Sequence, residues 1–240
     1  MELARNVLSQ VLHESGKKTN FIFIAGCSCC GKTTLANNLV SEIKSLNKQA
    51  IVVQEDSYFK NIKDVKRNYK GYFCLDDFEA FHLDEMKQDL KNLINSGKMD
   101  YPKYDICSNT RVGRRILIKK EIIIVEGLHV LEVFKNFEGF KIYMDTSPTL
   151  CLERRTERDM KLLNVSKNQV QDLFVSEIYP SFKQCIEPQK RLAELIVENN
   201  EKLILTKGRQ ANENERILWA FGFGNKSKSC VWNWFWQDCN

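Results

Sequence analysis

The stretch FIFIAGCSCCGKTT, residues 21–34, runs from a short apolar segment through a loop that holds two glycines, three cysteines and a lysine. The apolar segment, residues 21–25, has the length and composition of a strand buried in a parallel sheet. After the loop, residues 32–46 repeat leucine and isoleucine at helical spacing, which predicts a helix. A loop between a buried strand and a helix indicates an α/β fold.

The glycines and the lysine of this loop are spaced as in a phosphate-binding site. The pattern G-x-x-x-x-G-K-[ST] is met by Gly26, Gly31, Lys32 and Thr33. The glycines let the backbone turn tightly, so that successive N–H groups and the helix N-terminus face bound phosphates. Lys32 adds a positive charge at the β- and γ-phosphates, and Thr33 offers its hydroxyl to Mg²⁺. The predicted nucleotide-binding residues are Gly26, Cys27, Ser28, Cys29, Cys30, Gly31, Lys32, Thr33 and Thr34.

The cysteines of the loop do not suit a metal site. Tetrahedral zinc needs four ligands, for example C-x-x-C with a distant second pair, and the sequence offers no such pair. We therefore predict that Cys27, Cys29 and Cys30 are small loop residues. Because a helix N-terminus lowers the pKa of a nearby thiol, we also expect Cys29 or Cys30 to be open to oxidation.

Composition sets the broad class of the protein. A chain of 240 residues with 43% hydrophobic and 28% charged residues can bury a core. It has no run of 18 apolar residues and no signal-like start, so we expect a cytoplasmic protein that does not enter a membrane. Its nine cysteines are then reduced thiols. The net charge of +5 is spread along the chain, which suits anionic small molecules, and we expect no nucleic-acid partner.

Strands and helices alternate along the chain. Helices are predicted over residues 2–13, ending at Gly16, and 83–94, and further strands over 50–54, 121–127, 141–145, 193–197 and 202–206. This βαβ pattern indicates a parallel sheet flanked by helices. The predicted organisation is an N-terminal helix (1–18), one main domain (19–207) and a C-terminal extension (208–240).

Two acidic residues follow predicted strands. Asp56 comes just after residues 50–54, and Glu126 follows the apolar run IIIV within residues 121–127. Either acid alone is equally well explained as a helix cap or a surface charge. In a parallel sheet, however, ligands gather at the carboxyl ends of the strands. We therefore predict that Asp56 stands beside the γ-phosphate and that Glu126 holds the magnesium shell.

Seven stretches occur in the order found in a known family. They are GCSCCGKTTLA, QEDSYFK, LDDFEAF, YPKYDICSNTR, IIIVEG, LERRTERD and YPSFKQCIEPQKRLAELIV. From about residue 20 to residue 198 the chain resembles the uridine-cytidine kinases, within the P-loop small-metabolite kinases that include nicotinamide riboside kinases and phosphoribulokinases. The resemblance implies a P-loop NTPase-type three-layer sandwich with a helical lid, and ATP and Mg²⁺ as cofactors.

The resemblance also implies roles for single residues. Asp56 would accept the proton of the attacking 5′-hydroxyl, and Asp76 would grip the ribose hydroxyls. The implied catalytic residues are Asp56, Lys32, Arg155 and Arg158, the last two from the lid. The implied acceptor contacts are Asp56, Phe59, Asp76, Tyr104, Ile106, Asn109 and Arg158. The implied magnesium contacts are Thr33 and Glu126.

The chain departs from the uridine-cytidine kinases at several positions. A histidine that contacts the pyrimidine there is replaced by Asn109, and a second pair of lid arginines is replaced by KLLNVSK. LDDFEAF is as similar to the nicotinamide riboside kinase segment as to that of the uridine kinases. An alternative for LERRTERDM is an exposed helix face on which Glu153 and Glu157 pair with Arg154 and Arg158.

These observations predict an ATP-dependent kinase that phosphorylates the 5′-hydroxyl of a ribonucleoside, with uridine or cytidine as the acceptor. The alternatives are a nicotinamide riboside kinase, another P-loop small-metabolite kinase, and a P-loop ATPase switch without an acceptor. The expected partner is the nucleoside, and a homo-oligomer is allowed for. Residues 218–240 carry all four tryptophans. They could dock on the domain, stay disordered, or contact a partner or a membrane interface.

Overall fold

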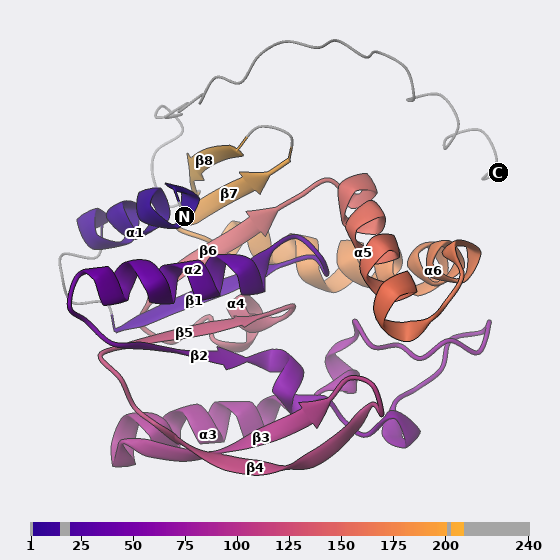
Figure 1. Cartoon of the computed structure of the whole chain (residues 1–240), viewed down its shortest axis with the longest axis horizontal. Helices are drawn as coiled ribbons and strands as arrows, with labels where there is room; N and C mark the ends of the chain where they lie inside the picture. Colours follow the sequence, from indigo (N-terminus) through magenta and orange to yellow (C-terminus); the bar gives the residue numbers. More distant parts are fainter. Residues whose placement is uncertain (1, 15–19, 201–202, 209–240) are drawn as a thin grey trace.

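The computed structural model describes residues 2–14, 20–200 and 203–208 (Figure 1). The predicted helix end at Gly16 and the Trp-rich segment at 218–240 lie outside these residues. In the described part, no helix is long and apolar enough to cross a membrane.

A six-stranded sheet forms the centre of the molecule. Its spatial order is β2 (Ala50–Gln54), β5 (Ile122–Gly127), β1 (Phe21–Gly26), β6 (Phe140–Asp145), β7 (Leu195–Asn199) and β8 (Leu203–Lys207). All six strands lie where the hydrophobic pattern predicts them. The first five are parallel, as the βαβ pattern predicts, and β8 is antiparallel to β7. The connection between β7 and β8 is too short for the crossover that a parallel pair needs.

The register of the sheet brings the phosphate loop and the predicted acids to one edge. Gln54 of β2 lies opposite Glu126 of β5, and Gly127 lies opposite Ala25 of β1. The carboxyl ends of three neighbouring strands therefore meet where the loop after β1 begins.

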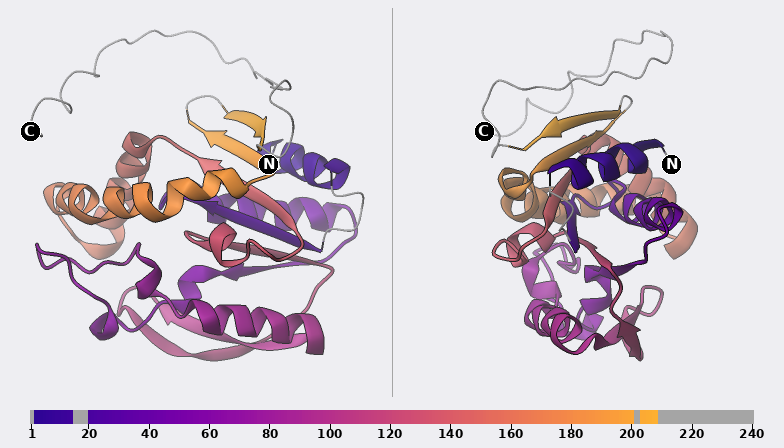
Figure 2. Two further views of the ribbon diagram at one scale, coloured as in Figure 1. Left: turned by 180° about the vertical axis from the view of Figure 1, so that it is seen from behind. Right: turned by 90° about the vertical axis from the view of Figure 1, so that its left-hand side faces the viewer.

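Helices cover both faces of the sheet (Figure 2). α2 (Lys32–Ser45) packs on β1, β2 and β5, and α1 (Glu2–Glu14) packs on α2. α4 (Val130–Val133) and η6 (Glu187–Leu192) contact β1 from the other face. Ala4, Val7, Leu8 and Val11 of α1 belong to the same buried core as the sheet. The layers are those of the predicted three-layer sandwich.

The lid region projects from the sheet beyond β6. α5 (Pro148–Leu163) is capped by Ser147, whose hydroxyl accepts from the Leu150 N–H, and ends at Asn164 with a φ of 53°. α6 (Lys167–Leu173) starts at a capping box. The chain then stays helical through η4 (Phe174–Ile178), α7 (Tyr179–Ser181), η5 (Phe182–Ile186) and η6.

A hairpin that the hydrophobic pattern missed lies beside β2. β3 (Lys98–Asp105) and β4 (Thr110–Ile118) form a separate two-stranded antiparallel sheet. β3 packs against α3 (Leu83–Ser96) and against η1 (Glu55–Tyr58). Two further turns of 3₁₀ helix, η2 (Ile62–Asp64) and η3 (Phe78–Ala80), complete this side of the molecule. β4 is largely exposed and rich in arginine, so it lacks the apolar alternation that marks a strand.

Candidate active site

The phosphate loop has a backbone that its glycines make possible. Gly26 has a φ of 152° and Gly31 a φ of 103°, both in the region that favours glycine. A Cβ at Gly26 would come within 2.5 Å of the Met144 carbonyl oxygen of β6, so there is no room for a side chain. Cys29 also has a positive φ, at 63°. The loop therefore turns tightly between β1 and α2, as predicted.

Lys32 points back across this loop. Its Nζ donates to the carbonyl oxygens of Gly26, at 3.0 Å, and of Cys27, at 2.8 Å. Burial by itself would lower the pKa of Lys32, but the neighbouring acidic groups, Cys30 first and then Glu126, outweigh it and raise the pKa. The ammonium group therefore stays charged in the middle of the predicted phosphate site.

Thr33 and Glu126 lie in contact although 93 positions separate them in sequence. The Thr33 hydroxyl donates to Glu126 Oε1 at 2.9 Å, and Gln54 Nε2 donates to the same oxygen at 3.1 Å. A hydroxyl and a carboxylate are hard oxygen ligands, the donor set that Mg²⁺ prefers. These two residues therefore fit the predicted magnesium contacts, and the sequence analysis missed Gln54.

Asp56 lies in η1, directly after β2. Its side chain is exposed, and the charges of Glu126, Lys32 and Glu55 act on it. Desolvation, followed by the negative charge of Glu126, raises the pKa of Asp56 to about 7, and Lys32 opposes the shift. The structure thus brings Asp56, Glu126 and Lys32 together, as the strand-end argument predicts.

Asp76 and Arg155 form a buried pair between the acceptor side and the lid. Arg155 Nη1 lies 3.9 Å from Asp76 Oδ1 and donates to Ser28 Oγ at 2.9 Å. Asp76 Oδ2 is buried and has no hydrogen-bond partner among the described residues. Arg155 therefore connects α5 to the phosphate loop, and Asp76 keeps one oxygen for a donor.

Asp159 organises both predicted lid arginines. It is buried and accepts from Arg155 Nε at 3.1 Å and from Arg158 Nε at 2.8 Å. Burial by itself would lower the pKa of Arg158, but acidic neighbours, Cys29 first, raise it.

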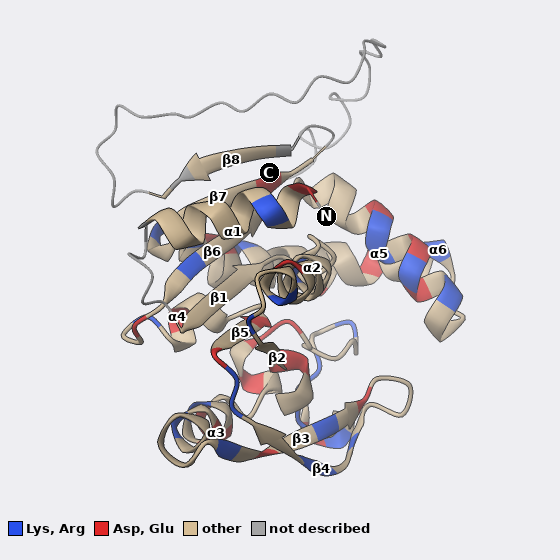
Figure 3. Cartoon of the chain, turned by 60° about the vertical axis from the view of Figure 1, so that its left-hand side comes forward, with Lys and Arg blue, Asp and Glu red and all other residues tan. Residues whose placement is uncertain are grey.

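The alternative pairing on this helix face is wrong. Glu157 pairs with Lys161 rather than with Arg158, and Arg154 donates to the Asn199 carbonyl oxygen. Figure 3 shows acidic (red) and basic (blue) residues intermixed along the ribbon of α5 and α6. The arginines nearest the phosphate loop are therefore held by Asp159, which the sequence analysis overlooked.

Aromatic rings surround two of the predicted acceptor contacts, Phe59 and Tyr104. Phe59 stacks on Phe81 with ring centroids 4.1 Å apart and lies 5.2 Å from the Tyr104 ring. The Tyr104 hydroxyl is buried without a partner among the described residues. Desolvation, followed by the charge of Asp56, raises the pKa of Tyr104 to about 12. Phe59 and Tyr104, both predicted as acceptor contacts, thus share one wall.

The other two predicted base contacts lie at the turn of the hairpin. Ile106 is exposed there, and Asn109 has a φ of 51°, a backbone conformation that asparagine tolerates. The Asn109 carbonyl oxygen accepts from the Ile62 N–H at 3.0 Å. Asn109 therefore has a role in the turn, which the sequence analysis did not foresee.

Comparison with known protein families agrees with this geometry. The profile described as the phosphoribulokinase / uridine kinase family matches residues 21–204. This chain belongs to the phosphoribulokinase/uridine kinase family. It is a P-loop kinase, a phosphotransferase with an alcohol group as acceptor. The predicted family and reaction class are confirmed.

Two relatives of this kinase are uridine kinases. One, from Lactobacillus helveticus, is 32% identical over 184 residues, which cover 75% of this chain and 87% of that protein. Another, from Staphylococcus aureus, is 34% identical over 184 residues, which cover 75% and 88%. A solved structure described as a possible uridine kinase from Bacillus stearothermophilus has a TM-score of 0.58 at 21% identity, over 82% of this chain and 99% of that chain. It shares the fold.

The thiols of the kinase's phosphate loop differ from the expectation for a helix N-terminus. Cys30 is fully buried, and desolvation raises its pKa to about 11 despite the nearby Lys32. The pKa of Cys27 is raised as well, first by a hydrogen bond with Cys151 and then by burial. Cys30 therefore does not fit the predicted reactive thiol, whereas Cys29 is only half-buried and its sensitivity to oxidation stays a prediction.

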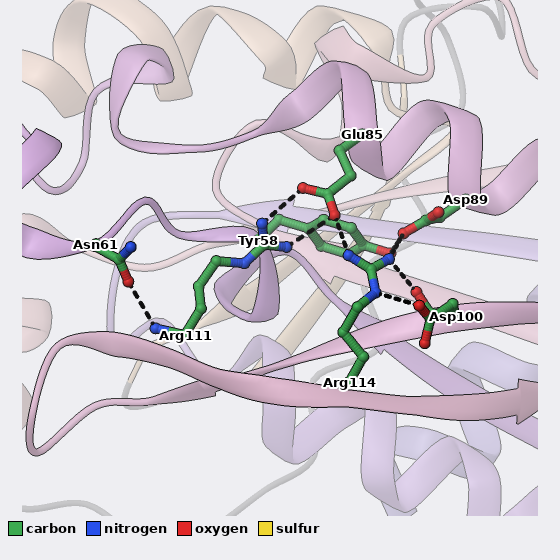
Figure 4. Close-up of polar contacts among 7 residues, drawn as sticks. All are labelled: Tyr58, Asn61, Glu85, Asp89, Asp100, Arg111 and Arg114. Carbon is green, nitrogen blue, oxygen red and sulfur yellow. Dashed lines mark hydrogen bonds and ion pairs between the residues drawn. The ribbon is translucent and has the colours of Figure 1, made fainter.

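An ion-pair network holds the kinase's hairpin on α3 (Figure 4). Arg111 donates to both oxygens of Glu85, at 2.9 and 3.0 Å. Arg114 contacts Glu85, Asp89 and Asp100. The network continues to the buried Tyr58, which donates to Asp89 at 3.2 Å. It joins β4 to α3 and η1, and so fixes the hairpin that carries Tyr104.

Asn199, at the end of β7, contacts the phosphate loop and holds its backbone in place. Its Nδ2 donates to the Cys30 carbonyl oxygen at 2.8 Å, and Thr146 donates to the same oxygen at 3.3 Å. A Cβ at Gly31 would press on Asn199 Nδ2 at 2.8 Å. No motif marks Asn199 in the sequence.

We expect Asn199→Ala to raise the Kd for ATP by about 5-fold, because one hydrogen bond that orients the loop is worth about 1 kcal/mol. Isothermal titration with ATP measures the change. Asn200→Ala is the matched control, since Asn200 contacts the Ser147 N–H and not the loop. Equal affinities of the wild type and Asn199→Ala would contradict this role.

Proposed function

We propose that this kinase transfers the γ-phosphate of ATP to the 5′-hydroxyl of a ribonucleoside, with uridine or cytidine as the acceptor. The observation that carries the proposal is the buried Oδ2 of Asp76, which has no hydrogen-bond partner in the part of the chain that the structure describes. Buried carboxylate oxygens are nearly always hydrogen-bonded, so this oxygen calls for a donor from a ligand, and ribose hydroxyls supply one. The names of the two uridine kinase relatives favour a pyrimidine nucleoside.

The roles of the other residues follow from phosphoryl-transfer chemistry. The transition state is loose, with negative charge on the equatorial oxygens, so catalysis depends on positioning and on charge neutralisation. Lys32 supplies positive charge from the loop, and Arg155 and Arg158 supply it from the lid. Asp56 accepts the proton of the attacking hydroxyl late in the reaction. Thr33 and Glu126 would hold Mg²⁺, which would supply positive charge to the phosphates when bound.

The base of the acceptor would lie against the aromatic wall. Phe59 and Tyr104 present ring faces, and the Tyr104 hydroxyl, which no described residue contacts by a hydrogen bond, adds one polar group to the wall. Ile106 and Asn109 at the hairpin turn complete the proposed acceptor contacts. An amide such as that of Asn109 can both donate and accept, as recognition of a pyrimidine edge requires.

Nicotinamide riboside is the second candidate acceptor. Its ring carries a positive charge, and aromatic faces beside carboxylates attract such a ring. Phe59 and Tyr104 lie close to Asp56, whose charge contributes to the raised pKa of Tyr104. This observation keeps the candidate open.

The deciding experiment is a phosphorylation assay with Mg-ATP and equal concentrations of nucleosides, vitamins and sugars. We expect uridine or cytidine to be the best acceptor and nicotinamide riboside the next. If a compound without a ribose wins, the acceptor assignment fails while the kinase class stands. ATP hydrolysis that no acceptor stimulates would indicate a P-loop ATPase switch.

A ribonucleoside should be preferred over its 2′-deoxy analogue by about 10² in kcat/KM, because Asp76 would be left with an unpaired buried oxygen. Asp76→Ala should remove most of this preference. Asp77→Ala is the matched control, since Asp77 accepts from the Glu79 N–H and caps η3. Equal use of both nucleosides by the wild type would rule out this role for Asp76.

A further inference from the structure

A buried carboxylate and a buried imidazole lie directly behind the proposed catalytic residue. Glu55 precedes Asp56 in η1 and is completely buried, as is His129 in the loop after β5. Glu55 Oε1 lies 2.7 Å from His129 Nδ1, and Glu55 Oε2 accepts from the His129 backbone N–H at 2.9 Å. Both carboxylate oxygens of Glu55 are therefore bound by one residue of another element.

The Glu55 side chain packs tightly against Gly127, the residue that follows Glu126. A Cβ at Gly127 would overlap the Glu55 side chain, so this position has no room for a larger residue. With Glu55 ionised, its carboxylate only accepts, so His129 Nδ1 is the donor between the two side chains. Among the described residues His129 Nε2 has no partner, so Glu55 provides the polar contact of this ring.

His129 also contacts the segment that carries Asp76. Its ring lies 4.1 Å from that of Phe78 and 5.4 Å from that of Phe81. Phe78 follows Asp76 by two positions, and Phe81 belongs to the aromatic wall. Three segments, each with one of the site's carboxylates, therefore meet at one imidazole.

We propose that Glu55 and His129 are positioning residues that fix Asp56, Glu126 and Asp76 relative to one another. Glu55 links η1, and with it Asp56, to the loop that leaves Glu126. His129 links that loop to the segment of Asp76 through Phe78. This inference rests on the proposed function, because the proposed function gives Asp56, Glu126 and Asp76 their roles.

This role predicts a specific pattern of losses. Without the imidazole donor, a buried oxygen of Glu55 is left unpaired, and η1 must shift to solvate it. Misplacement of a reacting group by about 1 Å can cost about 10² in rate. The phosphate loop makes none of the contacts described for this pair, so ATP affinity should not change.

The test compares His129→Phe, which keeps a ring against Phe78 without a donor, with His129→Asn, whose amide nitrogen can occupy the position of Nδ1. We expect kcat on the best acceptor to fall at least 10-fold in His129→Phe. In His129→Asn most of this loss should be restored. The Kd for ATP without Mg²⁺, from isothermal titration, should stay within 2-fold of the wild type in both. His13→Phe, on the exposed side of α1, is the control for the same chemical change.

Two results would overturn the inference: a kcat within 2-fold of the wild type in His129→Phe, or an ATP affinity that falls in parallel with kcat. If His129→Phe does not fold, Glu55→Ala and Glu55→Gln replace it. Glu55→Gln should recover most of the kcat lost in Glu55→Ala, because a glutamine can accept from the backbone and donate to the ring; equal losses would refute the pair. If the wild type phosphorylates no nucleoside, the proposed function fails, and the variants are measured on the acceptor that it does use.

Discussion

Replacing Lys32 with alanine lowers kcat by about 10³ or more, the largest single loss that we expect in this kinase. Lys32 Nζ lies within the phosphate loop and is held by two backbone carbonyl oxygens. The transition state carries its charge on the phosphoryl oxygens, and loss of one preorganised donor to such a charge costs about 10²–10³. Loss of a full positive charge costs at least as much. Steady-state phosphorylation of the best acceptor at saturating Mg-ATP measures the effect.

Lys161→Ala is the control for this substitution. Lys161 lies on α5 and pairs with Glu157, and both side chains are well exposed, so its loss should change neither activity nor stability measurably. Circular dichroism should show both variants folded. Turnover by Lys32→Ala within 10-fold of the wild type would mean that Lys32 does not stabilise the transferring phosphate.

The sequence determines the phosphate site well because its signals are local. The apolar run of β1, the two glycines and the helix of α2 follow one another without a gap, and each fixes the conformation of the next. The positions of Asp56 and Glu126 could also be predicted, because the carboxyl ends of parallel strands share one edge of the sheet. Their position beside the loop could be predicted without knowing how the side chains pack.

The residues that hold the site in place could not be predicted in this way. Asn199 and His129 act through contacts with residues 169 and 74 positions away. No periodicity connects such positions. The hairpin was missed for a related reason: β4 is stabilised by ion pairs with α3 rather than by an apolar face, so its sequence resembles a charged loop.

Cys30 shows how tertiary burial overrides a local rule. A thiol at a helix N-terminus beside a lysine should be acidic. Cys30 instead lies in the core under the loop, and the desolvation of a thiolate there outweighs the attraction of Lys32. The burial of Cys30 depends on β6 and β7, and the sequence of the loop alone does not indicate how these strands pack.

Asp56→Asn should lower kcat by about 10³, in the range of a lost general base, while it makes the ligand-free protein more stable. The pKa of Asp56 is about 7 when folded, against 3.8 for an ordinary aspartate. Between these two pH values the folded protein binds a proton that the unfolded chain has released, so Asp56 makes stability fall as the pH rises through this window. Asparagine carries no charge, so Asp56→Asn removes this fall in stability with rising pH.

The stability gain of Asp56→Asn should therefore be larger at pH 8 than at pH 5 in thermal unfolding without Mg-ATP. Because Asp56 is exposed, screening moderates the gain, and its dependence on pH is the decisive readout. Asp84→Asn is the control, since Asp84 is fully exposed and pairs with Lys87. An equal gain at both pH values would show that the pKa of Asp56 is not raised in the folded protein, and near-normal kcat would show that another group accepts the proton.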